Sequence, residues 1–158
     1  MFSKLSGYKQ LLPWIVICLA TGLVAGFLQS DALQTWYPLL HKSPLTPPGW
    51  AFFTVWTVLY IMMGISIGLA RREKHRNRAL LTAVFIAQLA VNFLWCMGFF
   101  VMRSPGSGLF LIIILLLLLL LYTWKVWPLR RASACLFIPY ILWVTFAIYL
   151  NSYIFFYN

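Results

Sequence analysis

The sequence predicts an all-α integral membrane protein: a single domain of five transmembrane helices with a long ordered loop between the first two. Hydrophobic residues make up 63% of the 158 residues and charged residues 9%, with a mean hydropathy of +0.90. A soluble domain carries far more charge than this. The chain also contains five apolar runs, each near the length of about 20 residues that a helix needs to cross a bilayer. Turn and charge signals separate the runs, which leaves almost no sequence for an extramembrane domain.

The first apolar run extends over residues 11–28 and follows Lys4 and Lys9. A basic segment followed by an apolar one is typical of a signal peptide or of a first transmembrane helix. The run is longer than the apolar core of a signal peptide, so we interpret it as a retained span. Within it, Gly22 and Gly26 form a GxxxG pair, which predicts a close helix contact.

Residues 29–49 form the longest polar interval and contain several prolines and aromatic residues. We expect an ordered loop that covers one end of the bundle. At its end, Thr46 is followed by Pro47 and Pro48. Proline is tolerated in the first turn of a helix, so Thr46 is the expected N-cap and the two prolines the expected first turn. The second span then covers residues 50–70.

The remaining three spans are expected over residues 79–102, 108–127 and 132–156. A charged hairpin, RREKHRNR at residues 71–78, precedes the first of them. Ser104, Pro105 and Gly106 predict a tight turn after it. Residues 115–121 are all leucine, so we expect the fourth span to be a wall that faces lipid.

The net charge is +10, and the basic residues stand at the ends of the apolar runs. In that position they indicate membrane topology, not a nucleic-acid surface. With five alternating spans, ten Lys and Arg residues fall on one side and only Lys42 and Arg103 on the other. The positive-inside rule therefore predicts a cytoplasmic N-terminus, with the loop and the C-terminus facing outward. Cleavage of the first run would leave the remaining charges equally well sorted.

Aromatic and amide residues recur at helical spacing in three of the spans. The stripes are Phe53, Trp56, Tyr60 and Gly64 in the second span, Gln88, Asn92, Trp95 and Phe99 in the third, and Tyr140, Trp143, Ala147 and Asn151 in the fifth. One interpretation is packing, with the amides joining helices and the rings filling volume. The other is a cavity for a flat, largely apolar ligand, since a buried amide is costly unless it is paired or faces a cavity. Three stripes beneath a stiff aromatic loop favour the cavity.

Conventional catalytic and metal-binding patterns do not occur in the sequence. Asp31 and Glu73 are the only acids and lie outside the spans, so neither the intramembrane carboxylate of a proton-coupled pump nor a general acid and base pair is present. His75 is expected on a solvated basic segment, whereas His41 in the loop is a candidate for meeting the polar edge of a ligand. The three cysteines have no paired spacing, so neither a disulfide nor a metal site is predicted.

Three motifs resemble those of one known family. They are SPLTPPGWAFFTVWTVLYIMMGIS at the second span, NFLWCMGFF in the third and PYILWVTFAIYLN in the fifth. Together they resemble the TspO/translocator protein family, the tryptophan-rich sensory proteins or peripheral-type benzodiazepine receptors. The resemblance covers nearly the whole chain, in order, with the family's length and five-span layout.

The resemblance implies a homodimeric five-helix bundle in a bacterial cell membrane, with a ligand cavity under the first loop. Its ligands would be porphyrins such as protoporphyrin IX and haem, bound as ligands and not as required cofactors, and benzodiazepine-type small molecules. The residues that would line the cavity are Tyr37, Pro47, Trp56, Tyr60, Asn92, Trp95, Phe99, Trp143 and Ala147. The dimer contact would involve Ala83 and Ala87 of the third span.

The chain departs from the family pattern at three places. Leu45 stands where relatives often carry Trp, so the loop has one ring fewer. The fourth span lacks the acidic residue of some relatives, and no Lys or Arg follows Tyr153 to complete a cholesterol motif. The first hypothesis for function is a tetrapyrrole-binding sensor or regulator. The alternatives are a transporter of porphyrins or other amphipathic molecules, and a light-dependent porphyrin-degrading enzyme that uses Trp56 and Trp143.

Overall fold

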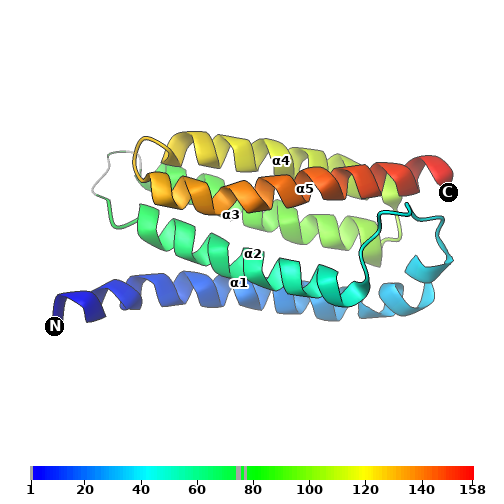
Figure 1. Cartoon of the computed structure of the whole chain (residues 1–158), viewed down its shortest axis with the longest axis horizontal. Helices are drawn as coiled ribbons and strands as arrows, with labels where there is room; N and C mark the ends of the chain where they lie inside the picture. Colours follow the sequence, from blue (N-terminus) through cyan, green and yellow to red (C-terminus); the bar gives the residue numbers. More distant parts are fainter. Residues whose placement is uncertain (1, 74–75, 77) are drawn as a thin grey trace.

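The computed structural model describes residues 2–73, 76 and 78–158, with backbone alone for residues 2–10, and its described part contains no β-strand. Five long helices lie side by side along a common axis, with the two termini at opposite ends (Figure 1). They are α1 (Phe2–Thr35), α2 (Gly49–Ala70), α3 (Arg78–Cys96), α4 (Pro105–Val126) and α5 (Arg131–Tyr157). A 3₁₀ turn, η1 (Tyr37–Leu39), follows α1, and a π-helical turn, η2 (Met97–Val101), follows α3.

All five helices are long and apolar enough to cross a membrane. The candidate spans are Leu11–Thr35, Gly49–Ala70, Arg78–Val101, Pro105–Val126 and Arg131–Tyr157. In the bundle α2 packs between α1 and α5, and α4 packs between α3 and α5. The predicted fold class, an all-α membrane bundle of five spans, is therefore confirmed.

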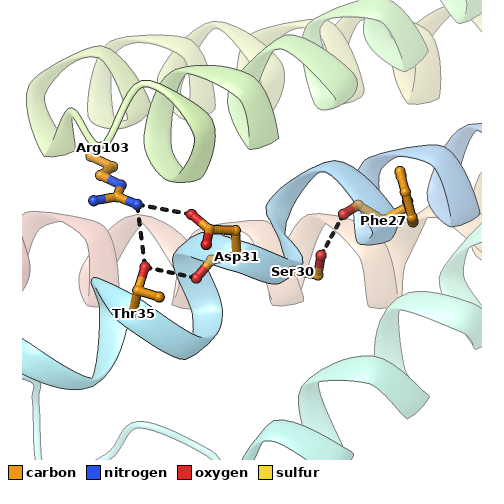
Figure 2. Close-up of polar contacts among 5 residues, drawn as sticks. All are labelled: Phe27, Ser30, Asp31, Thr35 and Arg103. Carbon is orange, nitrogen blue, oxygen red and sulfur yellow. Dashed lines mark hydrogen bonds and ion pairs between the residues drawn. The ribbon is translucent and has the colours of Figure 1, made fainter.

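The first helix is longer than the sequence predicts. It continues past residue 28 to Thr35, which shortens the predicted loop. Two polar side chains in this extension bond to carbonyls of their own helix: Ser30 Oγ donates to Phe27 O and Thr35 Oγ1 donates to Asp31 O (Figure 2). A polar composition indicated a loop here, but the segment has no Gly or Pro to end a helix before Pro38.

The start of α2 also differs from the prediction. The helix begins at Gly49, and Pro48 occupies the N-cap position in an extended conformation, with φ −64° and ψ 152°. Thr46 is therefore not the N-cap. The physical reason is that a residue before proline is pushed away from the α region, which disfavours a helix that starts at Thr46 or Pro47.

The glycine pair of α1 contributes one close contact, not two. A Cβ added to Gly22 would overlap the ring of Tyr60 on α2, whereas one added to Gly26 would meet nothing within 4 Å. A Cβ on a glycine of the other helix would meet backbone atoms first. A Cβ on Gly64 would lie 2.5 Å from the Cα of Ile15, so Gly64 brings α1 and α2 together.

The leucine run of α4 has two faces and is not simply a wall against lipid. Leu115 and Leu119 are fully buried together with Ile112, whereas Leu117 and Leu120 are exposed. The helical period of 3.6 residues places the first three side chains on one face. That face packs into the bundle, and the other faces the membrane.

The charged hairpin between α2 and α3 is only partly described, and the predicted role of His75 falls on one of the residues outside the description. Glu73 and Arg130 form an ion pair, with 2.8 Å between Glu73 Oε1 and Arg130 Nη1. This pair joins the α2–α3 connection to the α4–α5 connection at the same end of the bundle as the N-terminus (Figure 1). The basic residues of both connections therefore gather at one end, as the five-span layout requires.

Candidate functional site

Five buried rings from α2, α3, η2 and α5 form one group, which we call the aromatic cluster: Trp56, Tyr60, Trp95, Phe99 and Tyr140. Trp56 and Trp95 stack with ring centroids 5.6 Å apart and an interplanar angle of 26°. Trp56 also lies 5.9 Å from Tyr60 and 6.0 Å from Tyr140. Trp95 stacks on Phe99 at 6.4 Å. Ring contacts of this kind contribute stability in addition to that from the apolar area that they bury.

A chain of hydrogen bonds runs through the cluster. The hydroxyl of Tyr60 donates to Asn92 Oδ1 at 2.7 Å, and Asn92 Nδ2 donates to the hydroxyl of Tyr140 at 2.7 Å. Trp95 Nε1 donates to Asn151 Oδ1 at 3.0 Å. Each bond joins two helices, so α2, α3 and α5 are held in one arrangement. For Asn92 and Asn151 the packing interpretation therefore holds, because both amides are paired across the bundle.

Two indole nitrogens of the site have no hydrogen-bond partner among the residues that the structure describes. Nε1 of Trp56 and Nε1 of Trp143 are both buried and unpaired. Leaving a buried donor unpaired costs roughly 1–3 kcal/mol, and native structures contain few such groups. The contrast with the paired Nε1 of Trp95 makes these two N–H groups candidates for binding an acceptor atom of a ligand.

Phe52 connects Trp143 to the cluster. Its ring lies 5.6 Å from Trp143 and 6.2 Å from Trp56. The predicted stripe assigned this place to Phe53, but Phe53 is 68% exposed. The prediction was wrong because residues four apart, here Phe52, Trp56 and Tyr60, follow the inner face of α2 more closely at this end.

The turn η2 explains how two consecutive rings enter the site. Phe99 and Phe100 are both buried, 4.7 Å apart. The π-helical turn widens the backbone at this point, and such turns occur frequently at functional sites. Gly98 allows the approach of α4, since a Cβ there would lie 2.9 Å from Leu111.

The segment after α1 covers one end of the site. Trp36 contacts Phe99 at 5.6 Å, and Tyr37 contacts Phe100 at 5.6 Å and Phe99 at 6.4 Å. The Nζ of Lys42 lies 4.8 Å from the centroid of Tyr37. Burial raises the pKa of Tyr37 above its ordinary value, because the phenolate would lose its water. Tyr37 is therefore a neutral ring packed on η2.

The rest of the loop is fastened to α5. Ser43 Oγ and the hydroxyl of Tyr149 share a hydrogen bond of 2.9 Å. The backbone N–H of His41 donates to Asn158 Oδ1 at 2.8 Å, and Asn158 Nδ2 donates to His41 O at 3.1 Å. The side chain of Leu45, where the loop lacks a ring, is largely exposed. The loop is thus an ordered cover, as expected.

The structure brings together most of the predicted site residues. Trp56, Tyr60, Asn92, Trp95 and Phe99 lie in or on the aromatic cluster, Trp143 reaches it through Phe52, and Tyr37 covers Phe99. Ala147 is buried on α5, and Pro47 is half-buried in the loop. The predicted lining missed four rings that contact these residues: Trp36, Phe52, Phe100 and Tyr140. Tyr140 already stands in the predicted stripe of the fifth span, and Phe52 could have been found from its spacing of four residues to Trp56.

A groove of about 470 Å³ lies between α2 and α5, and we call it the α2–α5 groove. Its walls are almost entirely apolar: Thr54, Val55, Val58, Leu59 and Met62 from α2, with Pro139, Leu142, Trp143 and Phe146 from α5. The hydroxyl of Thr54 bonds to Trp50 O within its own helix. The groove therefore offers an apolar surface on the side of the bundle, in contact with Trp143. Among the described residues, no three His, Cys, Asp or Glu side chains gather as metal ligands.

Comparison with known proteins gives the same family throughout. The sequence model of the TspO/MBR family matches residues 14–157. The chain is 36% identical over 149 residues to the tryptophan-rich protein TspO of Archaeoglobus fulgidus, covering 94% of this chain and 97% of that protein. It is 31% identical over 140 residues to the tryptophan-rich sensory protein of Cereibacter sphaeroides, covering 89% and 85%. It is 30% identical over 150 residues to the translocator protein of Bos taurus, covering 88% of each chain. This integral membrane protein therefore belongs to the TspO/MBR family.

Proposed function

We propose that this protein is a membrane sensor or regulator that binds a tetrapyrrole, protoporphyrin IX or haem, at the aromatic cluster. Membership of a family whose members are named sensory and translocator proteins supports the general role. The observation that carries the proposal is the pair of buried, unpaired indole N–H groups of Trp56 and Trp143. A porphyrin offers a flat apolar ring for stacking on aromatic side chains and acceptor atoms for such donors.

Occupancy would be transmitted through ring contacts. Trp95 stacks on Phe99, and Phe99 contacts Trp36 and Tyr37 of the covering segment. A flat ligand that enters beside Trp56 must displace rings that now touch one another, so the shift reaches η2 and the loop. The ligand can change this equilibrium only by its differential affinity for the two arrangements. A partner that contacts the loop would detect the result.

The proposal is tested by titrating the protein in lipid nanodiscs with protoporphyrin IX and measuring the quenching of tryptophan fluorescence. We expect Trp56→Phe and Trp143→Phe each to weaken binding about tenfold, the equivalent of one hydrogen bond of about 1.4 kcal/mol. Asn92→Ala should also weaken it, because the rings lose their hydrogen-bonded support. The matched control is Trp124→Phe, since Trp124 is 71% exposed on α4. Undiminished affinity for protoporphyrin IX in Trp56→Phe, Trp143→Phe and Asn92→Ala would refute this site.

A second candidate function is light-dependent degradation of the porphyrin. It is favoured by the surroundings of Trp56, whose ring lies within 6.0 Å of three oxidisable rings, those of Trp95, Tyr60 and Tyr140. An indole that gave an electron to a photoexcited porphyrin could recover it from these neighbours. Several turnovers per protein under illumination, lost in Trp56→Phe and Trp143→Phe, are the required result. A transporter would instead carry porphyrin into sealed vesicles that contain only this protein.

We further propose that the outward face of α3 contacts a second copy of the chain. Ala83 is exposed and Ala87 half-exposed there, beside the exposed apolar side chains of Leu80 and Ile86. Small residues at this spacing allow two helices to approach closely within a membrane. Benzodiazepine-type molecules, which are also flat and largely apolar, would compete with porphyrin for the aromatic cluster. No additional cofactor is required by this scheme.

A further inference from the structure

The α2–α5 groove is open on the side of the bundle, at the depth of the spans. Val58 of its α2 wall is 49% exposed and Leu142 of its α5 wall is 65% exposed. Side chains that are exposed in the middle of transmembrane helices face lipid. The groove is therefore a hollow in the lipid-facing surface, and apolar molecules dissolved in the bilayer have direct access to it.

A row of contacting aromatic side chains connects one side of the groove to the aromatic cluster. Trp143 lines the groove and contacts Phe52, and Phe52 contacts Trp56. The indole N–H of Trp143 is buried, and no acceptor in the protein pairs with it. A flat molecule in the groove would thus meet first the ring of Trp143, whose unpaired donor is buried, and then, beyond one phenylalanine ring, Trp56 with a second buried donor. Among the residues that the structure describes, no charged side chain and no paired amide lines the groove or this row of rings.

The approach from the loop is different, because several polar contacts close it. Tyr149 holds Ser43, and Asn158 holds the backbone of His41 by two hydrogen bonds. Beneath them Trp36 and Tyr37 pack on η2. A ligand that entered here would have to break hydrogen bonds as well as displace rings.

The backbone of α5 is weakened at the groove. Pro139, one of the residues that line the groove, lies inside α5. Proline has no N–H to donate to the carbonyl four residues earlier, and its ring disturbs the preceding turn. This is the place in α5 where the helix bends most easily. Movement of the segment that carries Leu142 and Trp143 would widen the groove.

From these observations we infer that the α2–α5 groove is the membrane entrance of the ligand site: it binds a flat, apolar ring that carries a hydrogen-bond acceptor, and passes it from the bilayer to Trp143 and Trp56. This inference rests on the proposed porphyrin site and adds the direction of entry and the first contact. The occupant is the porphyrin itself, because the unpaired donor of Trp143 fits its acceptor atoms, whereas an acyl chain has none within the hydrocarbon region.

The test measures how fast protoporphyrin IX associates with the protein in phosphatidylcholine vesicles, by stopped-flow observation of porphyrin absorption. Leu142→Trp fills the groove, and we expect association to slow about tenfold or more, a barrier higher by about 1.4 kcal/mol. The dissociation constant should stay near that of the unaltered protein, because Leu142 is not part of the aromatic cluster. Leu120→Trp, on the lipid face of α4, is the matched control. Tyr149→Phe, which releases the loop from its hydrogen bond, should leave the rate unchanged.

Faster association in Tyr149→Phe together with an unaltered rate in Leu142→Trp would place the entrance at the loop and overturn the inference. Equal rates in all variants would overturn it as well. In both cases the equilibrium titration would still show binding, so only the route would be refuted. If the unaltered protein bound no porphyrin at equilibrium, the proposed function itself would fail, and the entrance with it.

Discussion

Trp56, Trp95 and Trp143 are the same residue type in two different chemical situations. The indole N–H of Trp95 donates to Asn151, whereas those of Trp56 and Trp143 are buried without a partner. Trp95 is therefore fixed by its hydrogen bond as well as by stacking. The other two retain an unused donor, which explains why we assign them, and not Trp95, the polar contact with a ligand.

At the residue scale, we expect the loss of the Asn92 amide to lower the free energy of unfolding more than the loss of either tyrosine hydroxyl that it binds. Asn92→Leu leaves the hydroxyls of Tyr60 and Tyr140 without this partner in the interior, so we expect a loss of about 2–3 kcal/mol. Tyr60→Phe removes one of the two bonds and keeps the ring, and should cost about 0.6–1.5 kcal/mol. Unfolding in mixed detergent micelles measures both. Equal losses in the two variants would mean that the hydrogen bonds do not act as a chain.

At the scale of the elements, the contacts between helices depend on a few small residues and turns. Gly64 allows α1 and α2 to touch, and η2 turns both Phe99 and Phe100 inward. A polar contact joins α1 to the turn after η2: Arg103 donates to Asp31 of α1 at 2.9 Å and to Thr35 of the same helix at 3.2 Å (Figure 2). It holds the end of α1, and hence Trp36, beside η2.

We expect alanine to have opposite effects at Gly64, where α1 and α2 touch, and at Gly26, where a Cβ would meet nothing within 4 Å. In Gly64→Ala the new Cβ would overlap the backbone of Ile15, so we expect a loss of about 2–3 kcal/mol from overpacking. In Gly26→Ala the Cβ meets open space, and the helix should gain up to about 1 kcal/mol. Thermal unfolding in detergent distinguishes the pair. A stable Gly64→Ala variant would show that the helices can separate at this point without cost.

The turn after η2 is strained at Arg103, which has a φ of 51°. We expect Arg103→Gly to be more stable than Arg103→Ala by about 1 kcal/mol, since only glycine adopts the left-handed region without cost. Asp31→Asn should cost less than about 1 kcal/mol, because the ion pair is exposed. Unfolding midpoints of the three variants give these differences. If the Gly and Ala variants were equally stable, backbone strain would not contribute.

At the scale of the whole molecule, the bundle has an asymmetric charge distribution and an apolar outer surface. The two basic connections lie at the end of the N-terminus, and the loop lies with the C-terminus at the other end (Figure 1). Large apolar side chains such as Phe27, Phe110 and Leu142 are exposed between the two ends. This surface suits a bilayer, and the charge distribution predicts which end stays in the cytoplasm.

Cys135 offers a direct test of that orientation. It is exposed near the start of α5, beside the basic residues Arg130 and Arg131, whereas Cys18 and Cys96 are buried. A membrane-impermeant maleimide should therefore label the protein in permeabilised cells and not in intact ones. Cys135→Ser is the control and should remain unlabelled in both. Labelling of intact cells would reverse the assigned orientation.

The sequence by itself determined the five spans, the bundle fold and the ordered loop, and it predicted most of the residues that the structure brings together around the aromatic cluster. These depend on hydrophobicity and on the helical period, which are local properties of the chain. The predicted end of α1 and the predicted start of α2 were wrong, because polar composition and proline positions do not show which backbone groups form hydrogen bonds. Boundaries of this kind depend on single hydrogen bonds.

Only the tertiary structure decided how the helices are rotated against one another. That rotation places Phe52 inside and Phe53 outside, pairs Asn92 with Tyr60 and Tyr140, and leaves the indoles of Trp56 and Trp143 unpaired. It also opens the α2–α5 groove beside Trp143. The physical reason is that the pairing of buried polar atoms and the shape of a surface depend on contacts between distant segments, which no periodic pattern within one helix contains.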